Sequence, residues 1–336
     1  MNATSTIPSR IVFMGTPDFA VPTLRALIAA TPHTVVGVVT QPDRPAGRGR
    51  KTRLSPVKQA AEESGLPIIQ PASLRREPDA VAQIRAWEPD FLVVVGFGQI
   101  LRQEVLDIPR VAPINVHASL LPRWRGAAPI QAAIRAGDIY TGVTTMIMDA
   151  GMDTGPILLQ DSIPIQPTET GQSLHDKLAA LGALLLIHTL NWLLTGSIQA
   201  HPQPTNDALI TYAPLLKKDD GAINWTASAV EIDRHARAYT PWPGVFTYWN
   251  GHRLKILEGY PIDANLGVPP GEVYDMRHTE FAEAFDFGIG TGRGLYVPTR
   301  LQLEGRQALD AAAFLNGAPD FMGARLEQRS TTAPSA

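Results

Sequence analysis

The sequence predicts an α/β domain with a doubly wound, mostly parallel sheet, followed by a smaller domain built as a β-barrel. Up to about residue 194, short apolar runs typical of buried strands alternate with amphipathic helical segments. A proline-rich polar segment then interrupts this pattern. Short alternating segments separated by turn residues follow it, which is typical of a small barrel.

The first domain is expected to begin with a strand over residues 10–15. Thr16, Pro17 and Asp18 then favour a capped helix that runs to about Ala30. Apolar runs and helical spacing place the remaining elements. Further strands are expected at 35–40, 66–69, 91–95 and 113–117 and within 141–160, and further helices at 56–64, 79–87, 127–136 and 172–194.

The second domain is expected to carry strands at 222–225, 245–249, 253–257, 271–274 and 295–303, with a helix at 231–239. A glycine-rich run at 288–294 is similar to a dinucleotide-binding loop, but a strand follows it, so a hairpin turn is predicted. These patterns divide the chain into a catalytic domain at 8–200, a linker at 201–211, a β-barrel at 212–326 and a disordered tail at 327–336.

Composition excludes several classes of function. The 336 residues favour two globular domains, and the net charge of −3 restricts any nucleic-acid site to a local basic patch. The chain has no cysteine, which excludes thiol nucleophiles and thiolate metal sites, and its eight histidines lack metal-binding spacing. No signal peptide is evident and the apolar stretch at 178–194 is interpreted as a buried helix. We therefore expect a cytoplasmic monomer with no metal and no membrane partner.

The strand at 113–117 carries the first candidate catalytic residues. Asn115 and His117 are two residues apart, so on a strand they point to the same side. An amide can donate to a developing oxyanion, and an imidazole can act as an acid or base near neutral pH. A loop with apolar and then basic residues, 118–126, follows directly and is of a kind that wraps a ligand. The spacing alone leaves open that both side chains merely end a strand.

A second loop, 149–155, carries two carboxylates between glycines. Turn chemistry alone would explain Asp149 and Asp153. A carboxylate near His117 would instead hold the imidazole in one tautomer. The sequence does not show whether the two loops meet.

Together, residues 115–117, 119–122 and 149–153 resemble the active-site signature of the 10-formyltetrahydrofolate-dependent formyltransferases. The resemblance implies that Asn115, His117 and Asp153 are catalytic and that a Rossmann-like domain carries them. It also implies that 10-formyltetrahydrofolate is the formyl donor and that no metal takes part. The folate site would include the tract Ser119, Leu120, Leu121 and Pro122.

The acceptor amine is indicated by a basic segment at 41–58. By itself this segment could be an ordinary solvated charge run. It also resembles the loop with which one class of the family enters the acceptor stem of initiator methionyl-tRNA, and the opening motif 15–20 resembles the same class. The segment holds one acid, Asp43, and the basic residues Arg44, Arg48, Arg50, Lys51, Arg53 and Lys58, of which all but Lys58 are predicted to bind tRNA.

Landmarks in the second domain resemble the OB-like barrel of that class, which helps to bind tRNA. They lie at 216–218, 241–244, 301–306 and 314–317. Two departures, Gly96 in a Gly-Phe-Gly run and Thr240 before Pro-Trp-Pro, lie outside the catalytic trio. We therefore expect formylation of the methionine on initiator tRNA. The alternatives are a formyltransferase for a small amine such as an amino-sugar nucleotide, and a non-catalytic RNA-binding module.

Overall fold

The computed structural model describes residues 7–46 and 51–327. It divides into two compact units, each assembled from separate stretches of chain. Unit 1 holds Met1–Pro129, Tyr140–Pro164 and Leu174–Pro214. Unit 2 holds Ile130–Ile139, Ile165–Ser173 and Leu215–Ala336. The functional division into a catalytic domain, a linker and a tRNA-binding domain stays a prediction.

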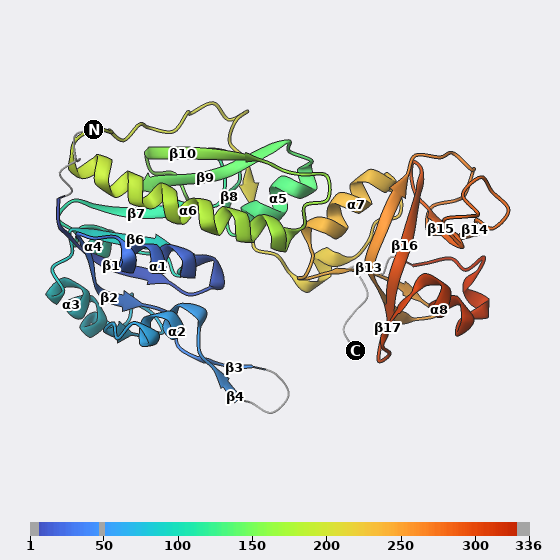
Figure 1. The fold of residues 1–336 in the computed structure, drawn as a ribbon, viewed down its shortest axis with the longest axis horizontal. Coiled ribbons are helices and arrows are strands. Elements are labelled where there is room, and N and C mark those ends of the chain that lie inside the picture. Colours follow the sequence, from blue (N-terminus) through green and yellow to red (C-terminus); the bar gives the residue numbers. More distant parts are fainter. Residues whose placement is uncertain (1–6, 47–50, 328–336) are drawn as a thin grey trace. The chain divides into compact units, whose positions relative to one another are not determined.

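Unit 1 is built on one mixed sheet in the order β10-β9-β7-β6-β1-β2-β5 (Figure 1). The five strands from β7 to β5 are parallel, while β9 and β10 add an antiparallel edge. The mostly parallel sheet predicted from the sequence is therefore confirmed. Its strands are β1 Ser9–Gly15, β2 His33–Val39, β5 Ile68–Ile69, β6 Phe91–Val95, β7 Ala112–His117, β9 Tyr140–Ile147 and β10 Ile157–Pro164.

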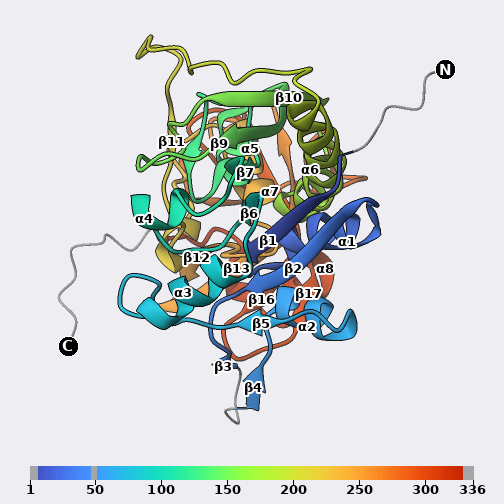
Figure 2. The same cartoon turned by 90° about the vertical axis from the view of Figure 1, so that its left-hand side faces the viewer.

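Helices cover both faces of this sheet, with α1 and α6 on one side and α3 and α4 on the other (Figure 2). Because both faces are covered, β6 is apolar throughout, and every one of its residues is buried. The helical segments of unit 1 are η1 Asp18–Ala20, α1 Val21–Ala29, α2 Pro56–Glu63, α3 Pro78–Ala86, α4 Gln103–Leu106 and most of α6 Gly171–Leu194.

Among the described residues, one helix, α6, is long and apolar enough to cross a membrane by length and composition alone. Within unit 1 it packs closely on the sheet. A methyl group at Gly182 would lie 2.9 Å from Val116 Cγ1, and the Thr189 and Thr145 hydroxyls are 2.8 Å apart. Its fully buried leucines recur on one face: Leu174, Leu178, Leu186 and Leu190.

Local signals explain where some helices begin and where one expectation was wrong. Ser55 caps α2 by accepting a hydrogen bond from the Lys58 amide at 3.1 Å. Thr16 does not cap the first helix, which begins as the 3-10 turn η1 after Pro17. Its hydroxyl donates instead to the Phe97 carbonyl at 3.3 Å and accepts from the Gln41 amide at 3.4 Å. Thr16 thus joins the loops at the ends of three strands.

Two small sheets complete unit 1. Part of the basic segment forms the antiparallel hairpin of β3 Arg44–Ala46 and β4 Lys51–Arg53, which projects from the body of the unit (Figure 1). The sequence pattern predicted no strands in this segment. The second sheet pairs β8 Arg125–Gly126 with β11 Tyr212–Ala213 in parallel. The chain therefore returns to the loop after β7 at the end of its last stretch in unit 1.

Unit 2 contains a curled antiparallel sheet that forms a half-barrel, which is consistent with the predicted OB-like fold. The last described residues of the chain form isolated β-bridges at both edges of this sheet: Arg325 pairs with Glu272, and Glu327 pairs with Tyr248. The expected hairpin at 288–294 is confirmed, but 222–225 form no strand and make only the isolated bridge from Ala222 to Phe246. The strands are β12 Val245–Trp249, β13 His252–Ile262, β14 Val273–Asp275, β15 Phe287–Gly290, β16 Leu295–Leu303 and β17 Ala308–Asp310. The helices are α5 Pro129–Ala136, η2 Lys218–Gly221, α7 Ala229–Ala238, α8 Ala311–Asn316 and η3 Pro319–Phe321, with the first residue of α5 counted in unit 1.

A buried histidine on α7 makes the stability of unit 2 depend on pH. His235 donates from Nε2 to the Asp220 carbonyl at 2.8 Å and stacks edge-on against Tyr239. Burial, together with the charge of Arg135, lowers the pKa of His235 to about 4. The unfolded chain therefore binds the proton more readily, so stability is complete above the ordinary histidine pKa and is lost as the pH falls toward 4.

We expect unit 2 to lose about 2 kcal/mol of unfolding free energy through His235 between pH 7 and pH 5. The measurement is urea unfolding at both pH values for the wild type and for His235→Gln, which has no ring to titrate. The difference in stability between the two proteins should move by that amount in favour of the variant at pH 5. An unchanged difference would contradict a neutral buried His235.

Candidate active site

Strand β7 places Asn115 and His117 on the same side, as their spacing predicts. His117 is the last residue of the strand and is 6% exposed, while Asn115 lies next to Val94 of β6. The His117 Nε2 atom donates a hydrogen bond to the Trp124 carbonyl at 2.9 Å. Because a carbonyl only accepts, this bond keeps a proton on Nε2 and leaves Nδ1 to face the site.

The 149–155 loop meets this strand end through Asp153. Asp153 Oδ1 lies 3.7 Å from His117 Nδ1, and the same oxygen accepts from Asn115 Nδ2 at 3.4 Å. The backbone amide of Gly126 donates to the other carboxylate oxygen at 2.8 Å. The structure therefore brings together the three residues that the sequence singled out.

The two aspartates of the loop have different tasks. Asp149 closes the turn: its carboxylate accepts from the Gly151 amide at 3.0 Å and from the Thr154 hydroxyl at 2.7 Å. The turn chemistry that could have explained both carboxylates thus accounts for Asp149. Asp153 has a backbone φ of 52°, a left-handed conformation that a non-glycine residue adopts only when its surroundings impose it.

The arrangement suits proton transfer beside a polarised oxygen. With a proton held on Nε2, the His117 ring turns Nδ1 toward Asp153 Oδ1, 3.7 Å away, so a proton taken up at Nδ1 would lie beside the carboxylate. The Asn115 amide carries two hydrogens, and its contact with Asp153 uses one of them. The second can be directed at the oxygen of a carbonyl substrate on which negative charge develops.

The tract 119–122, predicted to bind folate, is partly an internal brace. Ser119 is fully buried, and its hydroxyl donates to the Arg123 carbonyl at 2.6 Å. Leu121 is also buried, and its amide donates to the Thr144 hydroxyl at 3.1 Å. Leu120 and Pro122 are partly exposed, so they are the members of the tract that a ligand can touch.

The residues predicted to bind tRNA are placed only in part. Arg44, Lys51 and Arg53 lie on the strands of the β3–β4 hairpin. Arg48 and Arg50 lie outside the described residues. At the base of the segment, the Lys58 ammonium and Gln70 amide hydrogen-bond to Asp43 and hold the pKa of that carboxyl below its usual range. The one acid of the segment is therefore engaged at the base of the hairpin.

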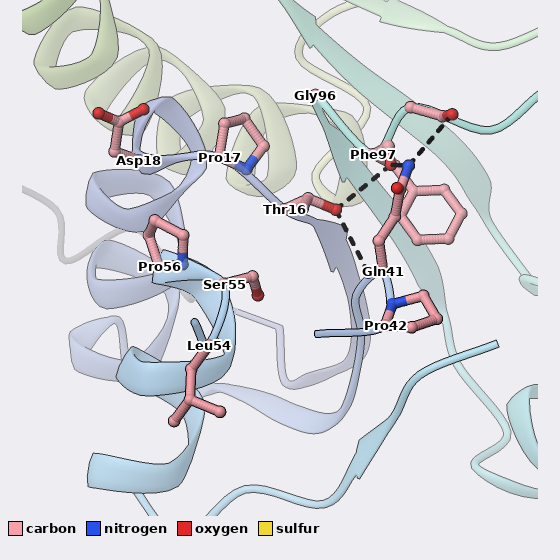
Figure 3. Close-up of a pocket in the computed structure, with 11 residues that line it drawn as sticks. Thr16, Pro17, Asp18, Gln41, Pro42, Leu54, Ser55, Pro56, Gly96 and Phe97 are labelled. Atoms are coloured by element: carbon pink, nitrogen blue, oxygen red, sulfur yellow. Dashed lines mark hydrogen bonds between the residues drawn. The ribbon is translucent and has the colours of Figure 1, made fainter. Parts of the chain in front are cut away.

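A pocket of about 530 Å³ opens at the carboxyl ends of β1, β2 and β6 (Figure 3). On one side of β1 the neighbouring strands are β2 and then β5, and on the other side they are β6 and then β7. The chain therefore reverses its direction across the sheet at β1, and ligands of doubly wound sheets bind at such a point. The catalytic candidates do not line it, but β7, which carries two of them, is the neighbour of β6. The lining residues are Thr16, Pro17, Asp18, Gln41, Pro42, Leu54, Ser55, Pro56, Gly96, Phe97 and Gly98.

No metal site is evident in the part of the chain that the structure describes. Within residues 7–46 and 51–327, no group of three or more histidine, aspartate or glutamate residues is arranged to hold a metal ion.

Sequence reasoning missed the residues that hold the site together. Arg125, expected in a loop that wraps a ligand, is only 6% exposed and points to Gln203. Gln203 lies between two prolines in the segment interpreted as a linker. Polar residues between prolines are common in linkers, so nothing in the sequence around Gln203 indicated that its side chain contacts the site.

Comparison with known proteins identifies the family of both parts of the chain. Residues 9–190 match the formyl transferase family, and residues 215–319 match the formyl transferase C-terminal domain. A methionyl-tRNA formyltransferase of Geobacter sulfurreducens is 47% identical over 317 residues, which cover 94% of this chain and 96% of that protein. A methionyl-tRNA formyltransferase of Pseudomonas paraeruginosa is 49% identical over 307 residues, which cover 91% and 95% of the two chains.

A solved structure shares the fold at low sequence identity. It is an N-formyltransferase from Helicobacter canadensis in complex with folinic acid and dTDP-3-aminofucose. The match has a TM-score of 0.61 and 17% identity, and covers 89% of this chain and 99% of the other. This likeness is one of fold.

Proposed function

The chain belongs to the formyl transferase family, and we propose that it transfers the formyl group of 10-formyltetrahydrofolate to the methionine amino group of initiator methionyl-tRNA. The observation that carries the chemistry is the convergence of Asn115 and His117 on one carboxylate oxygen of Asp153. The acceptor is supported by identities of 47–49% to methionyl-tRNA formyltransferases over more than nine-tenths of the chain.

In the proposed mechanism, His117 Nδ1 takes the proton that the attacking amine loses as the new C–N bond forms. Asp153 stabilises the imidazolium that results, because its carboxylate faces the same ring nitrogen. Asn115 donates to the formyl oxygen, where charge develops during the attack. His117 then returns the proton to the leaving nitrogen of the folate.

The donor fits the apolar edge beside the trio. Leu120 and Pro122 offer partly exposed surface for the flat ring system of a folate, while the Ser119 hydroxyl is bonded within the protein. The folate would supply the formyl group, and these side chains would orient it. The lack of cysteine among 336 residues suits the reducing cytoplasm, where we place the reaction.

Binding of tRNA would use the basic hairpin in unit 1 and a basic hollow in unit 2. Two cations, Arg253 and Lys255 of β13, and one carboxylate, Glu304, line a hollow of about 240 Å³. The Arg253 guanidinium carbon lies 3.6 Å from the centre of the Phe246 ring. Cations presented in this way suit phosphate oxygens.

The decisive experiment offers the purified protein 10-formyltetrahydrofolate with each of three acceptors: initiator methionyl-tRNA, elongator methionyl-tRNA and a dTDP-amino sugar. We expect rapid formylation of the initiator tRNA and no turnover of the sugar nucleotide. The sugar alternative rests on the likeness of fold alone. Turnover of the sugar without turnover of tRNA would overturn the proposed acceptor but leave the proposed chemistry intact.

A further inference from the structure

Gln203 occupies a position at which every hydrogen-bonding group of its amide is used. Its side chain is almost fully buried, and Nε2 donates to the carbonyl oxygens of Asp153 and Gly155, both at 2.8 Å. Its Oε1 accepts from Nε and Nη2 of Arg125 at 3.2 and 2.7 Å. The orientation of the amide is therefore unambiguous, since the reverse would set N–H groups against a guanidinium.

Arg125 is a buried cation directed at a neutral amide. In the part of the chain that the structure describes, both hydrogen bonds of its guanidinium end on Gln203 Oε1. A guanidinium on the oxygen of an amide polarises it and strengthens its N–H groups as donors. Arg125 therefore strengthens the two hydrogen bonds that Gln203 Nε2 donates to the 149–155 loop.

The same short segment also holds the other side of the site. Trp124 accepts the hydrogen bond of His117, and Gly126 donates to the Asp153 carboxylate. Arg125 lies between these two residues in the chain and donates to Gln203, which in turn donates a hydrogen bond to the backbone carbonyl of Asp153. Asp153 is thus held at its carboxylate and at its carbonyl, in a backbone conformation that needs such support.

The loop leaves little room for an alternative arrangement. A methyl group at Gly155 would lie 1.8 Å from the Ile147 carbonyl, so the chain passes close to β9 at this point. The backbone is anchored two residues before Gln203, because His201 and Ile157 exchange two hydrogen bonds of 2.8 Å. Gln203 therefore reaches the loop from a fixed base.

We propose that Gln203, backed by Arg125, is a positioning residue that sets the carboxylate of Asp153 against His117 for formyl transfer. This inference rests on the catalytic role proposed for Asp153. Gln203 acts through the loop and touches no reacting atom. Its loss should therefore lower kcat and leave the KM values of both substrates unchanged within about twofold, because a misplaced group costs mainly the chemical step.

The test uses Gln203→Glu and Gln203→Met. Gln203→Glu keeps an oxygen for Arg125 but replaces the two N–H donors by a carboxylate oxygen that faces two carbonyls. Gln203→Met has a side chain of similar length and removes all four hydrogen bonds of Gln203. We expect each to lower kcat on the order of tenfold to a hundredfold. Gln99→Glu is the matched control, because Gln99 also joins two backbone groups, Pro71 O and Leu74 N, away from the trio.

Two further readouts separate positioning from mere structural support. In an Asp153→Asn background, Gln203→Glu should change kcat by less than about twofold, because its effect runs through the carboxylate already lost. In protein with labelled histidine, the ring resonances of His117 should move in both Gln203 variants and stay in place in Gln99→Glu. Effects that multiply in the double variant, or a His117 signal that does not move, would overturn the proposal.

Failure of the proposed function would look different. If Asp153→Asn formylated tRNA as fast as the wild type, the catalytic role of Asp153 would be lost. The His117 resonances would still decide whether Gln203 positions the loop, because that measurement needs no turnover. Should Gln203→Glu fail to fold, as judged by thermal unfolding, Gln203→Met provides the same comparison.

Discussion

Replacing His117 by alanine is expected to lower kcat for formylation of methionyl-tRNA by about a hundredfold to ten-thousandfold. Removal of a positioned general acid or base has effects of this size. The histidine is the one member of the trio with a nitrogen that both faces Asp153 and can exchange a proton near neutral pH. The measurement is a single-turnover formylation with saturating folate and tRNA.

His188→Ala is the control for this substitution, because His188 is an exposed histidine of α6 away from the strand end. It should retain wild-type kcat. The affinity of His117→Ala for folate, measured by titration, should also remain unchanged. The two ring nitrogens of His117 face the Trp124 carbonyl and the Asp153 carboxylate, so the ring is not needed to hold the folate. Wild-type turnover in His117→Ala would contradict the proposed chemistry.

Neutralising three basic residues of the 41–58 segment is expected to weaken tRNA use on the order of a hundredfold at low salt and to leave folate affinity unchanged. The change is Arg48, Arg50 and Lys51 to glutamine in one protein. Each lost phosphate contact also removes nearly one unit of slope from the dependence of log affinity on log salt. The slope should therefore become shallower by about three.

The matched control neutralises Arg75, Arg76 and Arg85, three exposed arginines of unit 1, and so changes the net charge by the same amount. If both proteins lost tRNA affinity equally, overall charge rather than the hairpin would be responsible. If folate affinity fell together with tRNA affinity in the hairpin variant, the segment would belong to the donor site instead.

Periodicity predicted the features that depend on residues close together in the chain. Asn115 and His117 point the same way because alternate residues of a strand must do so, and β6 is buried throughout as its apolar run indicates. The bend at 291–294 was predictable because a strand, and no helix, follows the glycines. The resemblance to a known family then connected Asp153 with the strand, which spacing alone could not do.

What the sequence could not show are the contacts between distant segments. Thr16 looked like a helix cap, yet its hydroxyl serves the loops at residues 41 and 97, which only the sheet order brings near. Residues 222–225 alternate as a strand does, but they find a single bridge partner in Phe246. Gln203 followed no pattern, because a glutamine between prolines has no periodicity to reveal its target.

The pairing of β8 with β11 bears on the order in which the protein is completed during synthesis. A ribosome releases His117 and Asp153 well before the residues that brace them. The Thr211 hydroxyl accepts from the Trp124 amide at 2.8 Å, and the Arg125 amide donates to the Thr211 carbonyl at 2.9 Å. A nascent chain that has emerged only as far as residue 200 therefore carries the whole trio but lacks Gln203 and Thr211, which hold the surrounding loops in place. Competence for catalysis should arrive only once β11, which ends at Ala213, has emerged.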